Sequence, residues 1–331
     1  MTNDRLLCVF VHGYRGGDTT FKDFPNRLKT ITTHDRVEVK IYPKYKTSGD
    51  FQLAVKNLLA WLQGQVQLAQ KEAGCGRVRF VLLGHSMGGL VSAEAILHWK
   101  QNPEVLDADI LGLIAYDTPF YSVNHRFVTT QALSHAEQVN RHVSRFWSAT
   151  GAATTAATAA SATTSRSTKA AAIEYPGTAA TKKKSSSSSW GLLAGVVGVA
   201  AAGAAAYMAR EKITAGMTDV FDHLEFVSTL MDLNGCWERV RRLTELPDVM
   251  FKCFYVQLTS DDSLASDPRT FIALPPPETA HHFIPITSRM EGEIDAHTSI
   301  FDPSKNDHYY TLGLDSVSLI SEMLARQHRK R

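Results

Sequence analysis

The chain has 331 residues, of which 21% are charged, and its formal net charge is +2. A charge so close to balance argues against a nucleic-acid-binding surface, which needs clustered Lys and Arg. The length allows one large domain or two smaller ones with a substantial core.

Strands and helices alternate over the first 116 residues. The predicted elements are strands at 6–11, 37–42, 77–83 and 110–116, and helices at 51–67 and 90–99. The predicted inner face of the first helix consists of Leu53, Val55, Leu58, Leu59, Leu62 and Val66. This alternation predicts an α/β protein with a mostly parallel sheet that is flanked by helices.

The first strand begins at residue 6, which leaves no room for a signal peptide before it. The four cysteines are widely spaced and show no metal-type pairing. Cys8 and Cys253 fall in predicted strands, where a free cysteine behaves as a small core residue. We therefore expect an intracellular, cytoplasmic protein in a reducing compartment, with no metal and no organic cofactor.

The alternation stops after residue 147. Residues 148–189 are almost entirely Ala, Thr, Ser, Gly and Lys, a composition that buries too little apolar surface to offset its ordering entropy. The predicted division is therefore an N-terminal part of the core at 1–147, a disordered insert at 148–189, an apolar helix, lid or membrane-associated segment at 190–216, and a C-terminal part of the core at 217–331.

Residues 190–208 are uncharged and long enough for a transmembrane candidate. A single span would separate strands that one sheet needs from both sides of the segment. A packed helix, a re-entrant element and an interfacial anchor are the alternatives. One hypothesis places 182–208 on a membrane as a lid, with Lys182, Lys183 and Lys184 at an anionic surface.

The last part of the chain returns to the α/β pattern. The predicted elements are a helix at 219–246, strands at 250–258 and 269–274, and a terminal helix at 314–325. Three consecutive prolines at 275–277 end the second strand, because proline cannot continue a hydrogen-bonded ladder.

The most informative motif is Gly84-His85-Ser86-Met87-Gly88, between the strand at 77–83 and the helix at 90–99. A G-x-S-x-G sequence between a strand and a helix is typical of a nucleophile elbow, in which a strained turn lifts the serine hydroxyl above the sheet. The flanking glycines avoid clashes in that turn. Ser86 is therefore the candidate nucleophile.

A serine nucleophile needs backbone donors for the oxyanion that it generates. One donor is usually the amide of the following residue, here Met87. The second comes from the loop after an early strand, and His12-Gly13-Tyr14 follows the strand at 6–11. The Tyr14 or the Gly13 amide is the candidate second donor.

The serine also needs a base, and the base needs a carboxylate. Both should follow the serine in the chain, in the order Ser, acid, His. The candidate bases are His281, His282, His297 and His308. The candidate acids are Asp117, directly after the strand at 110–116, and Asp261 and Asp262, after the strand at 250–258. Spacing alone leaves both choices open.

Several blocks of the chain resemble a known family. They are residues 9–14, 20–25, 84–89, 115–120, 223–227, 293–301 and 309–313. These blocks resemble the fungal branch of the family described as putative serine esterases, lipase-like α/β hydrolases distantly similar to GPI-inositol deacylases. The family's Gly/Ala-rich middle segment is also similar to 190–208. The resemblance implies an α/β-hydrolase fold.

The resemblance favours His297 as the base, because the block around it looks family-like. It favours Asp117 as the acid for the same reason, with Asp262 as the alternative. The expected function is hydrolysis of a carboxylic ester, of a lipid or another apolar acyl compound, through an acyl-enzyme. A thioesterase or amidase would use the same groups, and a non-catalytic binding or scaffold protein is the alternative from another class.

Overall fold

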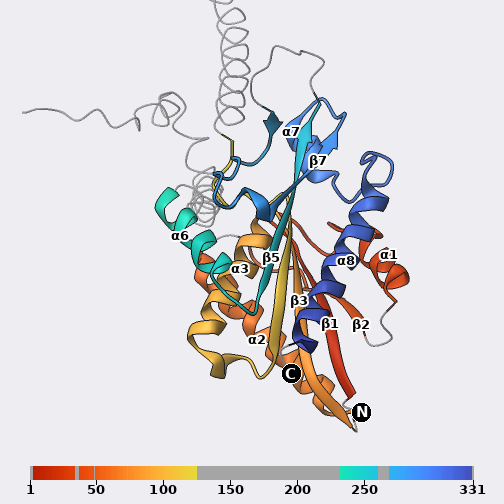
Figure 1. Ribbon diagram of the computed structural model, residues 1–331, viewed down its shortest axis with the longest axis vertical. Coiled ribbons are helices and arrows are strands. Elements are labelled where there is room, and N and C mark those ends of the chain that lie inside the picture. The colour runs from red at the N-terminus through yellow and green to blue at the C-terminus, as the bar shows by residue number, and fades with distance from the viewer. Residues whose placement is uncertain are drawn as a thin grey trace, which may run out of the picture. The chain divides into compact units, whose positions relative to one another are not determined.

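The centre of the fold is a seven-stranded, mostly parallel sheet with the order β2-β1-β3-β4-β5-β6, in which β7 also pairs with β5 (Figure 1). The computed structural model describes residues 3–33, 37–47, 49–72, 74–124, 232–259 and 268–329. The strands are β1 (Asn3–Val11), β2 (Val37–Ile41), β3 (Cys75–His85), β4 (Asp109–Tyr116), β5 (Met250–Leu258), β6 (Arg269–Thr270) and β7 (Phe283–Ser288). The helices are α1 (Phe24–Ile31), α2 (Phe51–Gln70), α3 (Met87–Gln101), η1 (Pro103–Val105), α6 (Leu233–Thr244), η3 (Ala280–His282), α7 (Glu293–Thr298) and α8 (Tyr309–His328).

The strand order reverses between β1 and β3. β1 pairs in parallel with β2 on one side and with β3 on the other, and the chain then continues outward from β3 to β4 and β5. The loops that leave β1 and β3 therefore run in opposite directions. In open α/β sheets this switch point opens a crevice beyond the carboxyl ends of the strands, where ligands bind. The fold thus places the loop after β1 and the turn after β3 side by side at this switch point.

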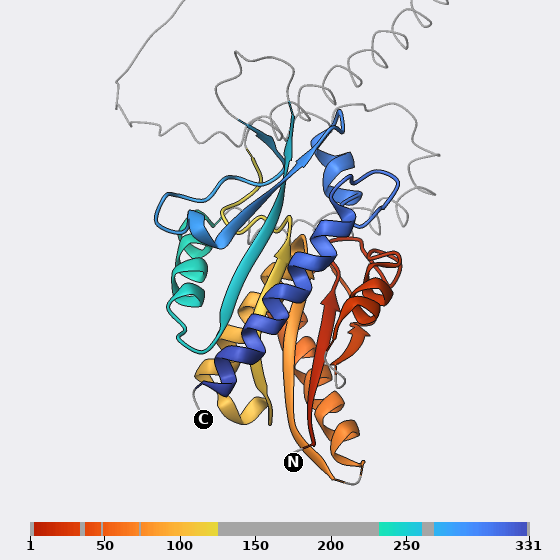
Figure 2. The ribbon, with the colours of Figure 1, turned by 45° about the vertical axis from the view of Figure 1, so that its right-hand side comes forward.

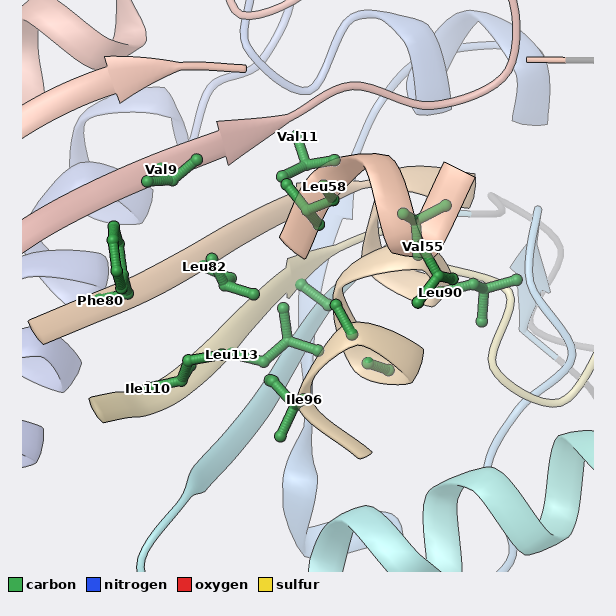
Figure 3. Packing of buried hydrophobic residues seen from close by; sticks show 14 of the residues in the cluster. Val9, Val11, Val55, Leu58, Phe80, Leu82, Leu90, Ile96, Ile110 and Leu113 are labelled. Atoms are coloured by element: carbon green, nitrogen blue, oxygen red, sulfur yellow. The ribbon is translucent and has the colours of Figure 1, made fainter. Parts of the chain in front are cut away.

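Each face of the sheet has its own apolar cluster. Along β1, Leu7, Val9 and Val11 point to the side of α2, α3 and α6, whereas Leu6, Cys8 and Phe10 point to the side of α1 and α8. Figure 2 shows α8 in front of the sheet with α2 and α3 behind it, and Figure 3 shows the strand side chains packed against α2 and α3. Full burial of each large side chain contributes roughly 1.5–3 kcal/mol. The predicted α/β-hydrolase class, a mostly parallel sheet flanked by helices, is confirmed.

Cys8 and Cys253 are fully buried free thiols in β1 and β5, as the sequence predicts. Burial raises the pKa of Cys8 to about 12 and also raises that of Cys253, so both thiols are protonated at neutral pH. They act as small core residues.

Three predictions about elements are wrong. Leu53 is 54% exposed, because the buried face of α2 runs along Phe51, Ala54, Val55, Leu58, Leu59, Leu62, Val66 and Ala69. The strand predicted at 269–274 is shortened to β6, after which Ile272 makes only an isolated bridge with Val123. The helix predicted at 219–246 does not run through Asp232, whose backbone is non-helical and whose side chain accepts from the Gly235 amide at the start of α6. Residues 219–231 lie outside the described residues.

Three elements, α1, β7 and α7, have no clear signal in the sequence. β7 contains Pro285 in the middle, a residue that favours a loop in a sequence pattern. It is tolerated here because β7 pairs with β5 along one edge, so the absent proline N–H is not needed by another strand. α7 has only six residues, too few for a helical period to be recognised.

Some predictions fall outside the described residues. These are the insert at 148–189, the apolar segment at 190–216, the proposed membrane contact at 182–208, and Asp261 and Asp262. In the part of the chain that the structure describes, no helix is long and apolar enough to cross a membrane. β4 pairs in parallel with β5, so strands from both sides of residues 125–231 share one sheet.

Candidate active site

Ser86 occupies a strained turn between β3 and α3. β3 ends at His85, α3 begins at Met87, and Ser86 between them has φ 54° and ψ −130°. A non-glycine residue in such a region costs of order 1–3 kcal/mol, which the surroundings must offset. Two backbone hydrogen bonds hold the turn, one from the Ser86 amide to the Tyr116 carbonyl (3.0 Å) and one from the Gly89 amide to the Ser86 carbonyl (3.0 Å). The geometry is that of the predicted strand–serine–helix elbow.

Glycines let the loop after β1 contact this turn directly. A Cβ atom on Gly88 would overlap the carbonyl oxygens of Val11 and His12. A Cβ atom on Gly13 would lie 2.6 Å from the Cβ atom of Ser86 and 2.8 Å from the His85 carbonyl oxygen. The first turn of α3 and the loop after β1 can therefore pack together only with glycine at both positions.

The same packing brings the candidate oxyanion donors together. The position of a Cβ atom on Gly13 lies 3.1 Å from the Met87 amide nitrogen. Met87 is the first residue of α3, and amides in the first turn of a helix have no acceptor within the helix. Tyr14 continues the loop from Gly13. The structure thus places the Gly13–Tyr14 loop and the Met87 amide beside Ser86, whereas their role as an oxyanion hole stays a prediction.

Replacing Gly13 with alanine is expected to lower kcat by about 10²-fold, as in the removal of one oxyanion donor. The added methyl group would push the loop away from Ser86 and misplace its amides. Steady-state hydrolysis of p-nitrophenyl butyrate measures the effect. Gly64→Ala is the matched control, because a Cβ atom there meets nothing within 4 Å. It should leave kcat unchanged and stabilise helix α2 by roughly 1 kcal/mol; wild-type kcat in both variants would contradict the role of the loop.

His12 fixes the conformation of this loop, a role the sequence analysis missed. Its Nδ1–H donates to the Gly13 carbonyl (3.0 Å), and its own carbonyl accepts from the Tyr45 hydroxyl (2.8 Å). The rings of His12 and Tyr45 stack with 4.5 Å between centroids. Burial lowers the pKa of His12, so the ring is neutral and its Nε2 accepts from the Tyr45 amide (3.4 Å). The residue is part of the motif after β1, but only the packing shows what its ring does.

Asp117 and His297 are in direct contact. Nδ1 of His297 lies 2.6 Å from Oδ2 of Asp117, which follows β4 and is fully buried. The other carboxylate oxygen, Oδ1, accepts from the Val256 amide (2.9 Å). A carboxylate fixed in this way holds the Nδ1–H tautomer, which leaves Nε2 of His297 with a free electron pair.

The other candidate histidines are engaged elsewhere. His282 lies in η3, where its Nδ1 bonds to the Phe251 carbonyl (3.0 Å). His281 precedes it in the same short helix, and its carbonyl accepts from Lys252 (2.8 Å). Nε2 of His308, just before α8, lies 2.8 Å from the Thr287 hydroxyl. Of the four predicted bases, His297 is the one that contacts Asp117; Asp262, the alternative acid, lies outside the described residues.

Two further side chains contact the His297 ring and were not predicted. The ring of Phe271 stacks on it with 3.9 Å between centroids, and the ring of His85 lies 4.7 Å away. Nε2 of His85 also lies 3.1 Å from the His297 carbonyl oxygen. His85 directly precedes Ser86 in the G-x-S-x-G motif, and this position is a sequence signal for a role at the site. No sequence signal points to Phe271.

Two cavities in the described residues lie away from Ser86. One cavity of about 280 Å³ is lined by Met250, Met323 and Arg326 among others, and one of about 310 Å³ by Arg27 and Tyr310 among others. Neither includes Ser86, Asp117 or His297, so neither holds a substrate for chemistry at Ser86. Within the described ranges, no group of three or more His, Cys, Asp or Glu side chains is arranged to hold a metal ion.

The chain is similar to several solved structures, over 36% of its length in two of them and 95% in a third. Phospholipase PlaB from Legionella pneumophila is 14% identical over 36% of this chain and 26% of its own, with a TM-score of 0.28. Lipase B from Aspergillus fumigatus is 16% identical over 36% of this chain and 25% of its own, with a TM-score of 0.27. The RedJ thioesterase of Streptomyces coelicolor is 14% identical over 95% of this chain and 86% of its own, with a TM-score of 0.31.

The chain thus spans about a quarter of the length of the phospholipase and the lipase. TM-scores this low establish nothing about the substrate, and the fold rests on the strand order and the elbow described above. No curated protein sequence matches the chain.

A family model gives the match that bears on the site. The model described as Putative serine esterase (DUF676) matches residues 1–149. This stretch contains Gly13, the elbow at Ser86 and Asp117, whereas His297 lies beyond it. The resemblance is confirmed for the sequence blocks within residues 1–149. The blocks at 223–227, 293–301 and 309–313 lie beyond the match, and the fungal branch stays a prediction. Residues 1–149, which carry the loop after β1, the strained turn at Ser86 and the buried Asp117, match the model of the putative serine esterase family.

Proposed function

We propose that this protein is a serine hydrolase that cleaves a carboxylic ester through Ser86, His297 and Asp117. The observation that carries the proposal is the 2.6 Å contact between Nδ1 of His297 and Oδ2 of buried Asp117, at the same sheet edge as the strained turn of Ser86. The family match at 1–149 supports a serine hydrolase. The assignment of the three roles is our own inference from the geometry.

The reaction proceeds in two halves. Nε2 of His297 takes the proton of the Ser86 hydroxyl as the oxygen attacks the ester carbonyl, and Asp117 stabilises the imidazolium that forms. The amides of Met87 and of Tyr14 or Gly13 bind the oxyanion, a contribution of roughly 3–4 kcal/mol per donor. His297 then gives the proton to the leaving alcohol, and an acyl-enzyme remains on Ser86. Water, activated by His297 in the same way, releases the acid and restores the serine.

The acyl group that we propose is that of a lipid or another apolar compound. The support is the resemblance of the sequence blocks to lipid esterases, together with the serine esterase match. A thioester or an amide would react with the same residues, and differs in its leaving group alone. Comparison of p-nitrophenyl esters of rising chain length with an acyl thioester of the same chain ranks these substrates directly.

Covalent labelling tests the proposal. A fluorophosphonate probe should label the wild-type protein at Ser86, because the activated hydroxyl attacks phosphorus, and Ser86→Ala should lose the label completely. Ser92→Ala is the matched control from the same helix; its hydroxyl bonds to the Gly88 carbonyl (2.7 Å) and is fully buried. It should label as the wild type does. Peptide mass spectrometry locates the labelled residue. Equal labelling of Ser86→Ala and wild type would show that Ser86 is not the nucleophile.

A further inference from the structure

The imidazole of His297 lies between two other rings. Phe271 covers one side at 3.9 Å between centroids and 28° between planes, and His85 stacks at 4.7 Å and 29°. These rings come from distant parts of the chain. His85 is the last residue of β3, and Phe271 follows β6, where its carbonyl accepts from the Asn124 amide (2.9 Å). His297 itself stands near the end of α7.

α7 needs contacts of this kind to hold a histidine in place. The helix has only six residues, and Gly292 before it supplies no side-chain cap. So short a helix is not stable by itself. The carbonyl of His297 belongs to the last turn of α7, where carbonyl oxygens have no N–H donor within the helix and need a donor from outside it. His85 supplies that donor at 3.1 Å.

The protonation state of His85 follows from this bond. A carbonyl oxygen only accepts, so Nε2 of His85 carries the proton and donates it. Burial first, and then the proximity of His297, hold the pKa of His85 well below its usual range, with His12 acting in the same direction. A neutral ring therefore faces His297, and no like charge opposes the imidazolium that forms during the reaction. Phe271 presents its π face to the same ring, which favours a cation.

We propose that His85 is a positioning residue, which together with Phe271 clamps the His297 ring between Asp117 and Ser86. This inference rests on the proposed function. The backbone bond fixes where the end of α7 lies, and the two rings fix the plane of the imidazole. Nδ1 then stays on Asp117, which leaves Nε2 for the proton transfer that the proposed function assigns to it. A misplacement of about 1 Å in such a site can lower a rate by about 10²-fold.

Two substitutions test the ring of His85 and its hydrogen-bond donor separately. His85→Phe keeps a ring against His297 and removes the hydrogen bond, whereas His85→Gln keeps a donor near the Nε2 position and removes the ring. Each should lower kcat by about 10- to 100-fold and leave KM for p-nitrophenyl butyrate unchanged. The pH at which kcat/KM is half-maximal on the acid side should also move, because the surroundings of His297 change. A purely structural role would lower the thermal unfolding temperature and move neither quantity.

His282 provides the matched control. It makes the same kinds of contact, a ring nitrogen on the Phe251 carbonyl at 3.0 Å and a stacked ring of Phe251 at 5.7 Å, but at a distance from Asp117. His282→Phe and His282→Gln should keep the wild-type kcat and pH profile. Wild-type kcat in both His85 variants, with labelling still lost in Ser86→Ala, would overturn the clamp and leave the proposed function intact. Equal labelling of Ser86→Ala and wild type would instead overturn the proposed function.

Phe271→Leu covers the case in which the His85 variants fail to fold. It removes the second ring without touching the elbow, and should lower kcat by roughly 10-fold with KM unchanged. A wild-type kcat in Phe271→Leu, combined with unfolded His85 variants, would show that His85 serves the fold alone and would overturn the inference.

Discussion

His297→Ala is expected to lower kcat by about 10⁶-fold, the loss seen when the base of a serine triad is removed. This substitution removes the imidazole that we propose takes the proton of Ser86. Fluorophosphonate labelling should slow in parallel, because it depends on the same activated hydroxyl. The measurement is steady-state or single-turnover hydrolysis of an activated p-nitrophenyl ester, which keeps very low rates detectable.

The other candidate histidines are the controls for this result. His281→Ala, His282→Ala and His308→Ala should retain wild-type kcat, because their described contacts lie away from Asp117. Each substitution removes an imidazole from the same C-terminal part of the chain. A large loss in one of these three variants, with full activity in His297→Ala, would assign the base to a different residue.

Asp117→Asn is expected to lower kcat by about 10⁴-fold, as the change from acid to amide does in a triad of this kind. The amide oxygen of asparagine can still accept from the Val256 amide, so the fold around the site is retained. Its NH₂ group would face Nδ1 of His297 and cannot accept a proton from it. The imidazole would then carry its proton on Nε2, where it cannot act as a base toward Ser86.

Asp262→Asn decides between the two acids that the sequence offers. We expect it to keep the wild-type kcat, because Asp117 already occupies Nδ1 of His297 at 2.6 Å. Circular dichroism and thermal unfolding of both variants check that each is folded. Full activity in Asp117→Asn together with a large loss in Asp262→Asn would reverse the assignment of the acid.

The elbow could be predicted from sequence because its determinants are local. A strand, a glycine-flanked serine and a helix follow one another within about 20 residues, and each is specified by short-range pattern and steric need. The structure places Ser86 between β3 and α3 with the strained backbone that this pattern predicts. The strand ranges around it were predictable for the same reason, since buried parallel strands are continuous apolar runs.

Elements without a clear period escaped prediction. β7 contains Pro285, which weakens the strand pattern in its sequence. α7, which carries His297, is too short to show a helical repeat. The apolar character of Leu53 predicts that it lies on the buried face of α2. Its side chain is nevertheless exposed, because the rotation of the helix against the sheet decides which residues are buried. Periodicity predicts that a helix has an apolar face, whereas the packing contacts decide which residues at the edge of that face are buried.

The sequence by itself indicated the reaction class that we propose, through a serine whose glycine neighbours favour a tight strand-to-helix turn. Only the tertiary structure decided which carboxylate holds which histidine, because Asp117 and His297 are 180 residues apart and meet through the pairing of β4 with β5. It also decided that His85 and Phe271 enclose the His297 ring. Local sequence fixes backbone geometry, but contacts between distant side chains depend on the packing of whole elements.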